Sequence, residues 1–581
     1  MAAHIKNPFI ETGMLPVDIV FHPLKRIVLL ILLSGLTHQS CRQSRPDSEK
    51  YLEAIEAFAH TVLEYGRDSY GDRHTPLFVD GLDTLALQPA LWKWEGGDTW
   101  VLSNFASQQA LMRLLDGLSG VTGEDRYREA AEDAAREALT TLRTPNGLLF
   151  WGGHSAWDLE DDKPVGEHEL RYHEVKNHQP YFRLLWRVNP DATRDLLKAI
   201  WGTHIMDWST LDYNRHGGNL IPFECGWEQE YNIDIEVPFP RVTGYNLSFC
   251  LVTPPLLHSG LTLAVLDNDH KALTWSRRLA YRWQQARHPE TGLSGGLLSY
   301  KEKEGDRAQI ALGHVYPHIN EAKILASYNQ TSRYHDLPLA QMQVGEILLE
   351  KESIYSDTGH ELIIWASGDL KSYGEQCYDP VKGVFPARMT DGTLIDGEKS
   401  VVGYYTPESF APAAPDGNLI WGYAMAYRLT HDTSHWSMLQ SLFRHMDLGE
   451  LGEPDGSGEK LNRETSSTDW RIIYALLELY KDSGNQAILE QACRITDNLL
   501  EWQSTSGLFP RPGRQYARTG DEVPLAILHL VAAIEGKSNL IPDPMLDAAF
   551  FHAEYYDDLE PDQQKRFDSR TYDNFVYYGP Q

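Results

Sequence analysis

Amphipathic helical segments recur along most of the chain and constrain its fold more than any other feature. Apolar residues return at helical spacing near 51–62, 110–118 and 125–143, with charged residues between them. This spacing is typical of a helix that buries one face. The same pattern recurs near 191–207, 257–268, 270–286, 317–329, 338–350, 358–372, 418–430, 434–446, 468–481, 486–502 and 522–535. Short turns between adjacent segments favour antiparallel helical hairpins.

A second pattern repeats in the loops after several of these helices. Four loops, at 144–150, 289–293, 379–385 and 504–509, share a polar turn, a glycine and then apolar residues. Glycine permits a left-handed exit from a helix, after which the apolar residues turn back over the core. The unequal intervals between the loops exclude a short solenoid repeat. We therefore predict an all-α fold in which about seven helical hairpins close into an (α/α) toroid.

The segment 214–255 interrupts the helical pattern. It lacks the helical period and is rich in proline, aromatic and β-branched residues. We predict strands and loops here, forming a small β region on one rim of the toroid, where functional residues tend to lie. No low-complexity linker divides the chain, so we predict one domain over residues 41–581.

The N-terminus predicts export. Two basic residues precede an apolar run at 27–36, and Cys41 follows a few residues later. Ten apolar residues are too few to span a bilayer, but they are typical of a signal peptide. Residues 38–41 resemble a loose bacterial lipobox, so we predict a lipoprotein-type signal peptide over 1–40 and a lipid anchor at Cys41. The protein would then be periplasmic or anchored to the outer membrane; the alternative is a buried N-terminal helix.

The charge balance limits the possible partners. The chain of 581 residues has 52 Lys and Arg against 82 Asp and Glu, a formal net charge of −30. This balance excludes general nucleic-acid binding, which needs a basic face. We find no P-loop, no dinucleotide-binding glycine motif after a strand and no serine nucleophile elbow. An acidic substrate would require a local group of positive charges.

The richest polar region, 151–216, contains candidate metal ligands. His173 and His178 are five residues apart, whereas a zinc protease helix needs a spacing of four, so that motif is excluded. His154 follows two glycines, and His216 precedes two more. With Glu174 they offer two imidazoles and one carboxylate, which favour a first-row transition ion over calcium. The alternative is that these loop histidines are structural.

A family resemblance supports this group. The motifs at 151–154, 173–177 and 214–216 resemble, in residues and spacing, the metal and base region of polysaccharide lyase family 2, the periplasmic pectate lyases. Segments 65–71 and 76–82 resemble the N-terminal part of that family, so the resemblance covers roughly the first half of the chain. It implies an (α/α) barrel of about seven hairpins that cleaves polygalacturonate by metal-assisted β-elimination.

The resemblance also implies roles for single residues. His154, Glu174 and His216 would hold a divalent transition ion, with manganese first and nickel or cobalt as alternatives. Arg215 would be the Brønsted base, although an arginine normally stays protonated and a nearby cation would have to lower its pKa. If Arg215 stays charged, it would clamp the substrate carboxylate, and Tyr172 or Tyr213 would take the proton.

Four further residues are candidates for binding a uronate polymer. Arg171 and Lys176 flank Glu174, and Arg241 lies beside the irregular segment, so all three would neutralise uronate charges. Trp227 would stack on a sugar face. The alternative roles are solvated surface charges for the cations and core packing for Trp227.

Two other functions remain open from the sequence. One is a glycoside hydrolase on the same toroid, with a carboxylate pair such as Asp158 and Glu174, or two of Glu224, Glu228 and Glu230. The other is a lipid-anchored glycan-binding protein without turnover. Pectate or its oligomers are the substrate that we expect first.

Overall fold

The structure, a computed structural model, describes residues 48–93, 99–175, 179–241, 248–302, 305–325, 336–351, 353–396 and 410–547. Contacts divide the chain into two units, Met1–Ser44 and Arg45–Gln581, and all described residues belong to the second. The predicted signal peptide and Cys41 lie outside the described residues.

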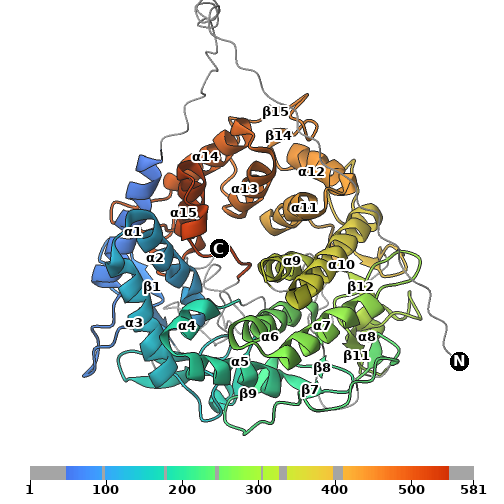
Figure 1. Cartoon of the computed structure of the whole chain (residues 1–581), viewed down its shortest axis with the longest axis horizontal. Helices are drawn as coiled ribbons and strands as arrows, with labels where there is room; N and C mark the ends of the chain where they lie inside the picture. Colours follow the sequence, from blue (N-terminus) through green and yellow to red (C-terminus); the bar gives the residue numbers. More distant parts are fainter. Residues whose placement is uncertain are drawn as a thin grey trace, which may run out of the picture. The chain divides into compact units, whose positions relative to one another are not determined.

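Fifteen α-helices fall within the described residues, and fourteen of them alternate between an inner and an outer ring (Figure 1). The inner helices are α2 (Gln109–Thr122), α4 (Phe182–Val188), α6 (Thr253–Asp267), α9 (Asp336–Leu349), α11 (Gly417–Thr430), α13 (Arg471–Ser483) and α15 (Glu522–Glu535). The outer helices are α1 (Glu49–Tyr65), α3 (Asp125–Thr141), α5 (Pro190–His204), α7 (His270–Gln285), α10 (Ser353–Cys377), α12 (Thr433–His445) and α14 (Gln486–Leu500). Helix α15 packs against both α1 and α2, which closes the ring. The predicted toroid of seven hairpins is confirmed.

The two kinds of connection between the rings differ in length. Turns from inner to outer helices are short, such as 123–124 and 268–269, whereas the connections from outer to inner helices are long. Because successive helices run in opposite directions, all the long connections lie at one rim. They carry the strands of the described part, which pair as β1 (Gly81–Asp83) with β16 (Tyr516–Arg518); β2 (Leu91–Lys93), β3 (Thr99–Ser103), β4 (Ser155–Asp158) and β5 (Lys163–Gly166) in one sheet; β6 (Tyr172–Glu174) with β9 (His216–Gly218); β7 (Ile205–Asp207) with β8 (Asp212–Tyr213); β10 (Phe239–Pro240) with β11 (Ser299–Tyr300); β12 (Ile324–Leu325) with β13 (Arg388–Met389); and β14 (Gly449–Glu450) with β15 (Lys460–Leu461). The β region predicted within 214–255 is therefore part of a larger loop rim.

The glycine of each repeated loop has the predicted left-handed conformation. The φ angles of Gly147, Gly292, Gly383 and Gly507 are 92°, 70°, 68° and 84°. Each glycine begins one of the long connections, after α3, α7, α10 and α14. The repeated sequence pattern thus marks the exits of outer helices toward the loop rim.

The helix expected at 317–329 is wrong. Its described residues form one 3-10 turn, Glu321–Lys323, followed by β12. Ile319, Ala322 and Ile324 are buried, and the first two are three residues apart, which is the spacing of neighbours on one helix face. The short helices α4 and α8 (Arg307–Leu312) are absent from the predicted set because neither is long enough to show a clear period.

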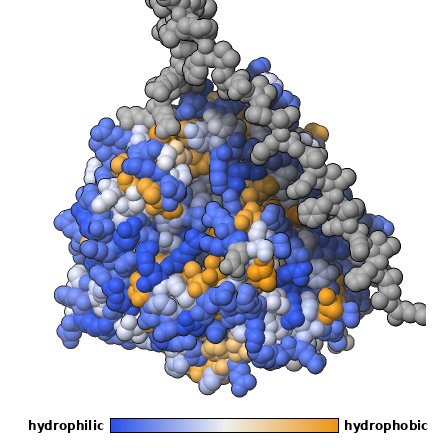
Figure 2. Space-filling model, in the orientation of Figure 1, coloured by the Kyte–Doolittle hydropathy of each residue, from blue (hydrophilic) through white to orange (hydrophobic). Residues whose placement is uncertain are grey.

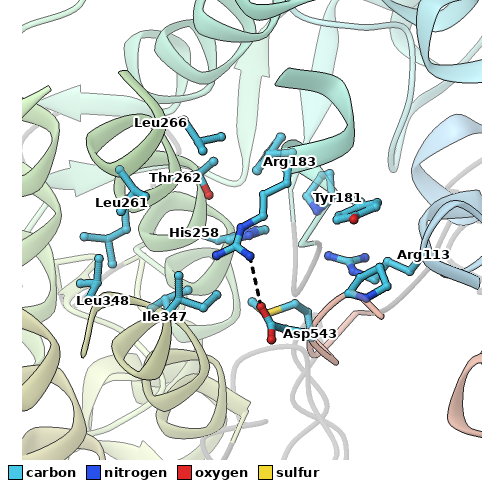
Figure 3. Close-up of a pocket in the computed structure, with 16 residues that line it drawn as sticks. Arg113, Tyr181, Arg183, His258, Leu261, Thr262, Leu266, Ile347, Leu348 and Asp543 are labelled. Carbon is cyan, nitrogen blue, oxygen red and sulfur yellow. Dashed lines mark hydrogen bonds and ion pairs between the residues drawn. The ribbon is translucent and has the colours of Figure 1, made fainter. Parts of the chain in front are cut away.

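A segment after α15 passes through the ring interior. The amide of Leu546 donates to Gln343 Oε1 on α9 at 2.9 Å, and its carbonyl accepts from Gln179 Nε2 at 2.8 Å. Asp543 faces Arg183 at 3.5 Å across a cavity of about 60 Å³ lined by α4, α6 and α9 (Figure 3). The segment 541–547 therefore closes part of the ring interior.

The distribution of polar and apolar residues agrees with this ring of helices. The face seen in Figure 2 is largely hydrophilic, with apolar side chains in small separate patches. Within the described residues, one stretch, Cys250–Asp267, is long and apolar enough for a membrane span, with a mean hydropathy of 1.3. It is 78% buried and contains the inner helix α6, so it is a core helix of the ring.

Candidate metal centre and active site

Short strand pairings bring three distant segments together at the loop rim. Strand β6 pairs antiparallel with β9 so that Glu174 lies opposite His216, and Gly152 forms a parallel bridge to Glu174. Gly152 has a φ of 95°, and a Cβ there would lie 2.8 Å from the Glu174 carbonyl oxygen. A glycine is therefore needed at position 152, two residues before His154, for this close approach.

The three candidate ligands converge. His154 Nε2 lies 3.1 Å from His216 Nε2 and 3.5 Å from Glu174 Oε2. His216 Nε2 lies 3.5 Å from Glu174 Oε1, and the Glu174 side chain is fully buried. One ligand atom from each residue can be chosen so that all lie within 4.8 Å of one another. The structure thus brings together the three residues that the sequence singled out.

The surroundings of the two imidazoles suit metal binding. His154 Nδ1 lies 3.2 Å from Glu167 Oε2, so a proton on Nδ1 leaves the lone pair of Nε2 directed at Glu174 and His216. Burial lowers the pKa of His216, although Glu174 opposes this effect. Neutral imidazoles and a carboxylate are the form in which these residues bind a metal, and the donor set fits a first-row transition ion.

Arg215 lies beside this group. Its Nε is 3.1 Å from Glu174 Oε1 and 3.1 Å from His216 Nε2. The guanidinium lies over the ring of Phe249 at 5.7 Å, and 26% of the Arg215 side chain is exposed. Arg215 is therefore held against the buried carboxylate and is also accessible to a ligand from solvent.

The two tyrosines near the site differ sharply. The ring of Tyr172 stacks on His216 with centroids 5.4 Å apart, and Tyr172 is 40% exposed. Tyr213 is buried, and its hydroxyl donates to the carbonyl of Phe249 at 3.0 Å. Burial raises the pKa of Tyr213 well above its usual value. Of the two tyrosines, Tyr172 is the one placed to meet a substrate.

The predicted substrate cations lie in different settings. Arg171 is exposed and forms an ion pair with Glu169, and Lys176 lies outside the described residues. The amide of Arg241 donates to the carbonyl of Tyr300 at 2.9 Å.

Arg241 also belongs to a cationic group on the loop rim. Burial lowers the pKa of Lys301, and the charges of Arg241 and Arg307 lower it further, whereas Glu321 and Asp306 raise it. The three cations therefore lie together with two neighbouring carboxylates.

Trp227 packs within an aromatic cluster. Its ring centroid lies 5.0 Å from that of Trp201 and 5.2 Å from that of Trp208. Trp275 joins the same cluster and donates from Nε1 to the carbonyl of Trp227 at 3.1 Å. These contacts favour the packing role of Trp227 over sugar stacking.

The carboxylates considered for a hydrolase lie in different settings. Asp158 is buried, and its Oδ1 accepts from the amides of Val101 at 3.0 Å and Glu160 at 3.2 Å. Burial raises the pKa of Asp158. The remaining candidates, Glu224, Glu228 and Glu230, are exposed.

Two contributors to the site were not identified from the sequence. Glu167 faces His154 because Ser155 pairs with Gly166 in the β4–β5 hairpin, which places the residues just beyond this pair side by side. A hairpin prediction over 155–166 would have indicated it. His204, at the end of α5, contacts His173 and the carbonyl of Asn214, and no local pattern marks it.

The fold and the site define the class of protein: a helical toroid whose loop rim holds a buried His-Glu-His group beside an arginine. The sequence profile of the family described as "Periplasmic pectate lyase" matches residues 75–554. The chain therefore belongs to the periplasmic pectate lyase family and is a polysaccharide lyase. The family resemblance inferred from the motifs is confirmed.

Individual relatives also match this protein over most of its length. The chain is 25% identical over 533 residues to a pectate disaccharide-lyase of Dickeya dadantii (strain 3937), covering 87% of this chain and 93% of the relative. Among solved structures, an alpha-1,6-mannanase from Salegentibacter sp. HEL1_6 has a TM-score of 0.36 at 11% identity, covering 84% of this chain and 99% of that one. A cellobiose 2-epimerase from Bacillus thermoamylovorans B4167 has a TM-score of 0.39 at 10% identity, covering 84% of this chain and 100% of that one.

Proposed function

We propose that this chain cleaves pectate or its oligomers by metal-assisted β-elimination at the His154, Glu174 and His216 group. The observation that carries the proposal is the convergence of two imidazole Nε2 atoms and a buried carboxylate next to Arg215. The family membership and the pectate disaccharide-lyase relative support pectate as the substrate.

His154, Glu174 and His216 would hold a divalent transition ion, with manganese first and nickel or cobalt next. Such an ion supplies positive charge to the uronate carboxylate and so stabilises the enolate-like charge that develops when the neighbouring proton leaves. Glu167 orients His154, and the β6–β9 pairing holds Glu174 opposite His216.

Arg215 is the proposed base. In the elimination, the C5–H bond breaks, its electron pair forms the C4–C5 double bond, and the C4–O bond breaks to release the other sugar, whose oxygen takes a proton from water. Arg215 would take the C5 proton in its neutral form, the only form of arginine with an acceptor, from its partly exposed position beside Glu174. Tyr172 is the second candidate for this role, with Arg215 then binding the carboxylate as a cation.

The substrate charges require a local group of cations in a chain of net charge −30. Arg171 and Lys176, which flank Glu174 in sequence, and the cationic group of Arg241, Lys301 and Arg307 would supply it. Long-range repulsion by the acidic chain weakens at high salt, so binding would depend on these few centres.

We also propose that the protein is exported, with a signal peptide over 1–40, a lipid anchor at Cys41 and one domain over 41–581. The periplasmic description of the family supports an exported location.

The function is tested by incubating the protein with polygalacturonate and with other uronic-acid polymers. We expect absorbance from the new C4–C5 double bond together with new reducing ends. Reducing ends without that absorbance would establish a hydrolase and refute the lyase chemistry. Binding without any cleavage of any polymer would establish a glycan-binding protein instead.

A further inference from the structure

We infer that Trp151, His173 and His204 form a hydrogen-bonded chain that positions the metal ligands. These are positioning residues, because they would act through the ligands and not on the substrate. The inference rests on the proposed metal site, and it gives a role to three residues for which neither the motifs nor the comparisons state one.

The direction of each hydrogen bond follows from chemistry. Trp151 Nε1 is only a donor, and it lies 2.7 Å from His173 Nε2, which must therefore accept. A neutral His173 then carries its proton on Nδ1, which lies 2.9 Å from His204 Nε2. His204 in turn carries its proton on Nδ1 and donates to the carbonyl of Asn214 at 2.8 Å. One indole N–H thus sets the tautomers of both histidines.

The hydrogen-bonded chain links the three segments that carry the site residues. Trp151 lies three residues before His154, and His173 directly precedes Glu174. The last acceptor of the hydrogen-bonded chain is the carbonyl of Asn214, the residue directly before Arg215. A change in any of these bonds would move the backbone that carries a ligand or the base.

Burial makes these bonds energetically important. Trp151 and His173 are each 1% exposed, and His204 is 0% exposed. A buried donor or acceptor that loses its partner destabilises the folded protein, so the alternative tautomers are disfavoured. The hydrogen-bonded chain of Trp151, His173 and His204 is therefore a fixed scaffold and not a mobile contact.

Gly217 shows how closely this chain packs against the ligand strand. A Cβ at Gly217 would lie 2.6 Å from Thr203 Oγ1 and 2.7 Å from His204 Nε2. Only glycine leaves room for His204 beside β9, directly after His216 in the sequence.

Groups that orient metal ligands typically change metal affinity about 10- to 100-fold when they are lost. The Trp151→Phe variant keeps an aromatic ring but removes the N–H that begins the chain. The His204→Phe variant removes both of its hydrogen bonds, and His204→Gln keeps an amide that can restore part of them.

The matched control is His435→Phe. His435, on α12, is also fully buried, and its Nε2 lies within hydrogen-bond distance of Ser367 Oγ, at 2.7 Å. Its loss costs folding stability in the same way but lies far along the chain from the ligand segments.

The experiment is a Co²⁺ titration of metal-stripped full-length protein, with affinity and the visible Co²⁺ spectrum as readouts. We expect about 10-fold or greater weakening and an altered spectrum for Trp151→Phe and His204→Phe, partial recovery for His204→Gln, and wild-type behaviour for His435→Phe. If Trp151→Phe binds Co²⁺ within twofold of wild type and with the same spectrum, the positioning chain is refuted.

The same titration separates the two proposals. A wild-type protein that binds no Co²⁺ overturns the metal site and this inference with it. A wild-type protein that binds Co²⁺ but eliminates no uronate overturns the proposed function, while the ordered affinities of the variants still support the positioning chain.

Discussion

Replacing Arg215 by methionine should separate metal affinity from turnover. Arg215 Nε lies 3.1 Å from Glu174 Oε1 and 3.1 Å from His216 Nε2, two of the proposed ligand atoms. A positive guanidinium in this position opposes the binding of a cation by the same residues. Methionine keeps much of the side-chain length without the charge.

The magnitude follows from the distances and the exposure. Two unit charges about 4 Å apart interact by about 4 kcal/mol at an effective dielectric constant of about 20. A divalent ion doubles this, but 26% of the Arg215 side chain is exposed, and solvent screening reduces such interactions severalfold. A remaining effect of about 1–3 kcal/mol corresponds to roughly 5- to 150-fold tighter metal binding by Arg215→Met. Loss of the base should lower kcat about 10²- to 10⁴-fold.

The assay pairs calorimetric titration of Mn²⁺ into stripped protein with the rate of double-bond formation on polygalacturonate. The matched control is Arg171→Met, because Arg171 is 63% exposed and pairs with an exposed glutamate. We expect its metal affinity to stay within about twofold of wild type. If Arg215→Met loses affinity and turnover in parallel, Arg215 supports the ligands instead of opposing the cation, and the reasoning is refuted.

Three other perturbations test separate parts of the account. Burial raises the pKa of Asp369 to about 7 despite Arg287, so the contribution of Asp369 to stability should fall by about 4 kcal/mol as pH rises from about 4 to 7, and Asp369→Asn should remove this contribution from the pH dependence seen in denaturant titrations. Tyr213→Phe should lower stability by about 1–3 kcal/mol in thermal melts and leave the pH profile of kcat unchanged, because the buried hydroxyl makes structural hydrogen bonds to the Phe249 carbonyl and Thr253 Oγ1. Gly217→Ala should weaken Co²⁺ binding at least about 10-fold, because its Cβ would lie 2.7 Å from His204 Nε2.

Each of these three predictions has an outcome that would contradict it. Parallel pH–stability curves for wild type and Asp369→Asn would show that this carboxyl is ionised in the folded protein throughout the range. A shifted pH profile for Tyr213→Phe would restore Tyr213 as a proton acceptor. Unchanged Co²⁺ affinity for Gly217→Ala would show that β9 can move away from His204 without disturbing His216.

The sequence predicts the hairpins well because helical amphipathicity and glycine exits are local. Gly147 and Gly507 take their positive φ angles for reasons visible within a few residues. The error at 317–329 arose because a small buried loop cluster can show helix-like spacing over one turn. Closure of the ring through α1, α2 and α15 joins residues more than 400 positions apart, and no local pattern reports such a contact.

The site was predictable in its ligand types and less so in its support. His154, Glu174 and His216 were identifiable from their chemistry, their neighbouring glycines and the family motifs. Glu167 and His204 were not, because their roles depend on a hairpin register and on the end of a helix.

The most direct test of the central claim is restoration of activity to metal-stripped protein. The account predicts no double-bond absorbance from polygalacturonate without metal, and recovery with Mn²⁺, Ni²⁺ or Co²⁺ but not with Ca²⁺, because two imidazoles and one carboxylate favour a transition ion. Full activity in the presence of a chelator, or recovery that is best with Ca²⁺, would contradict it.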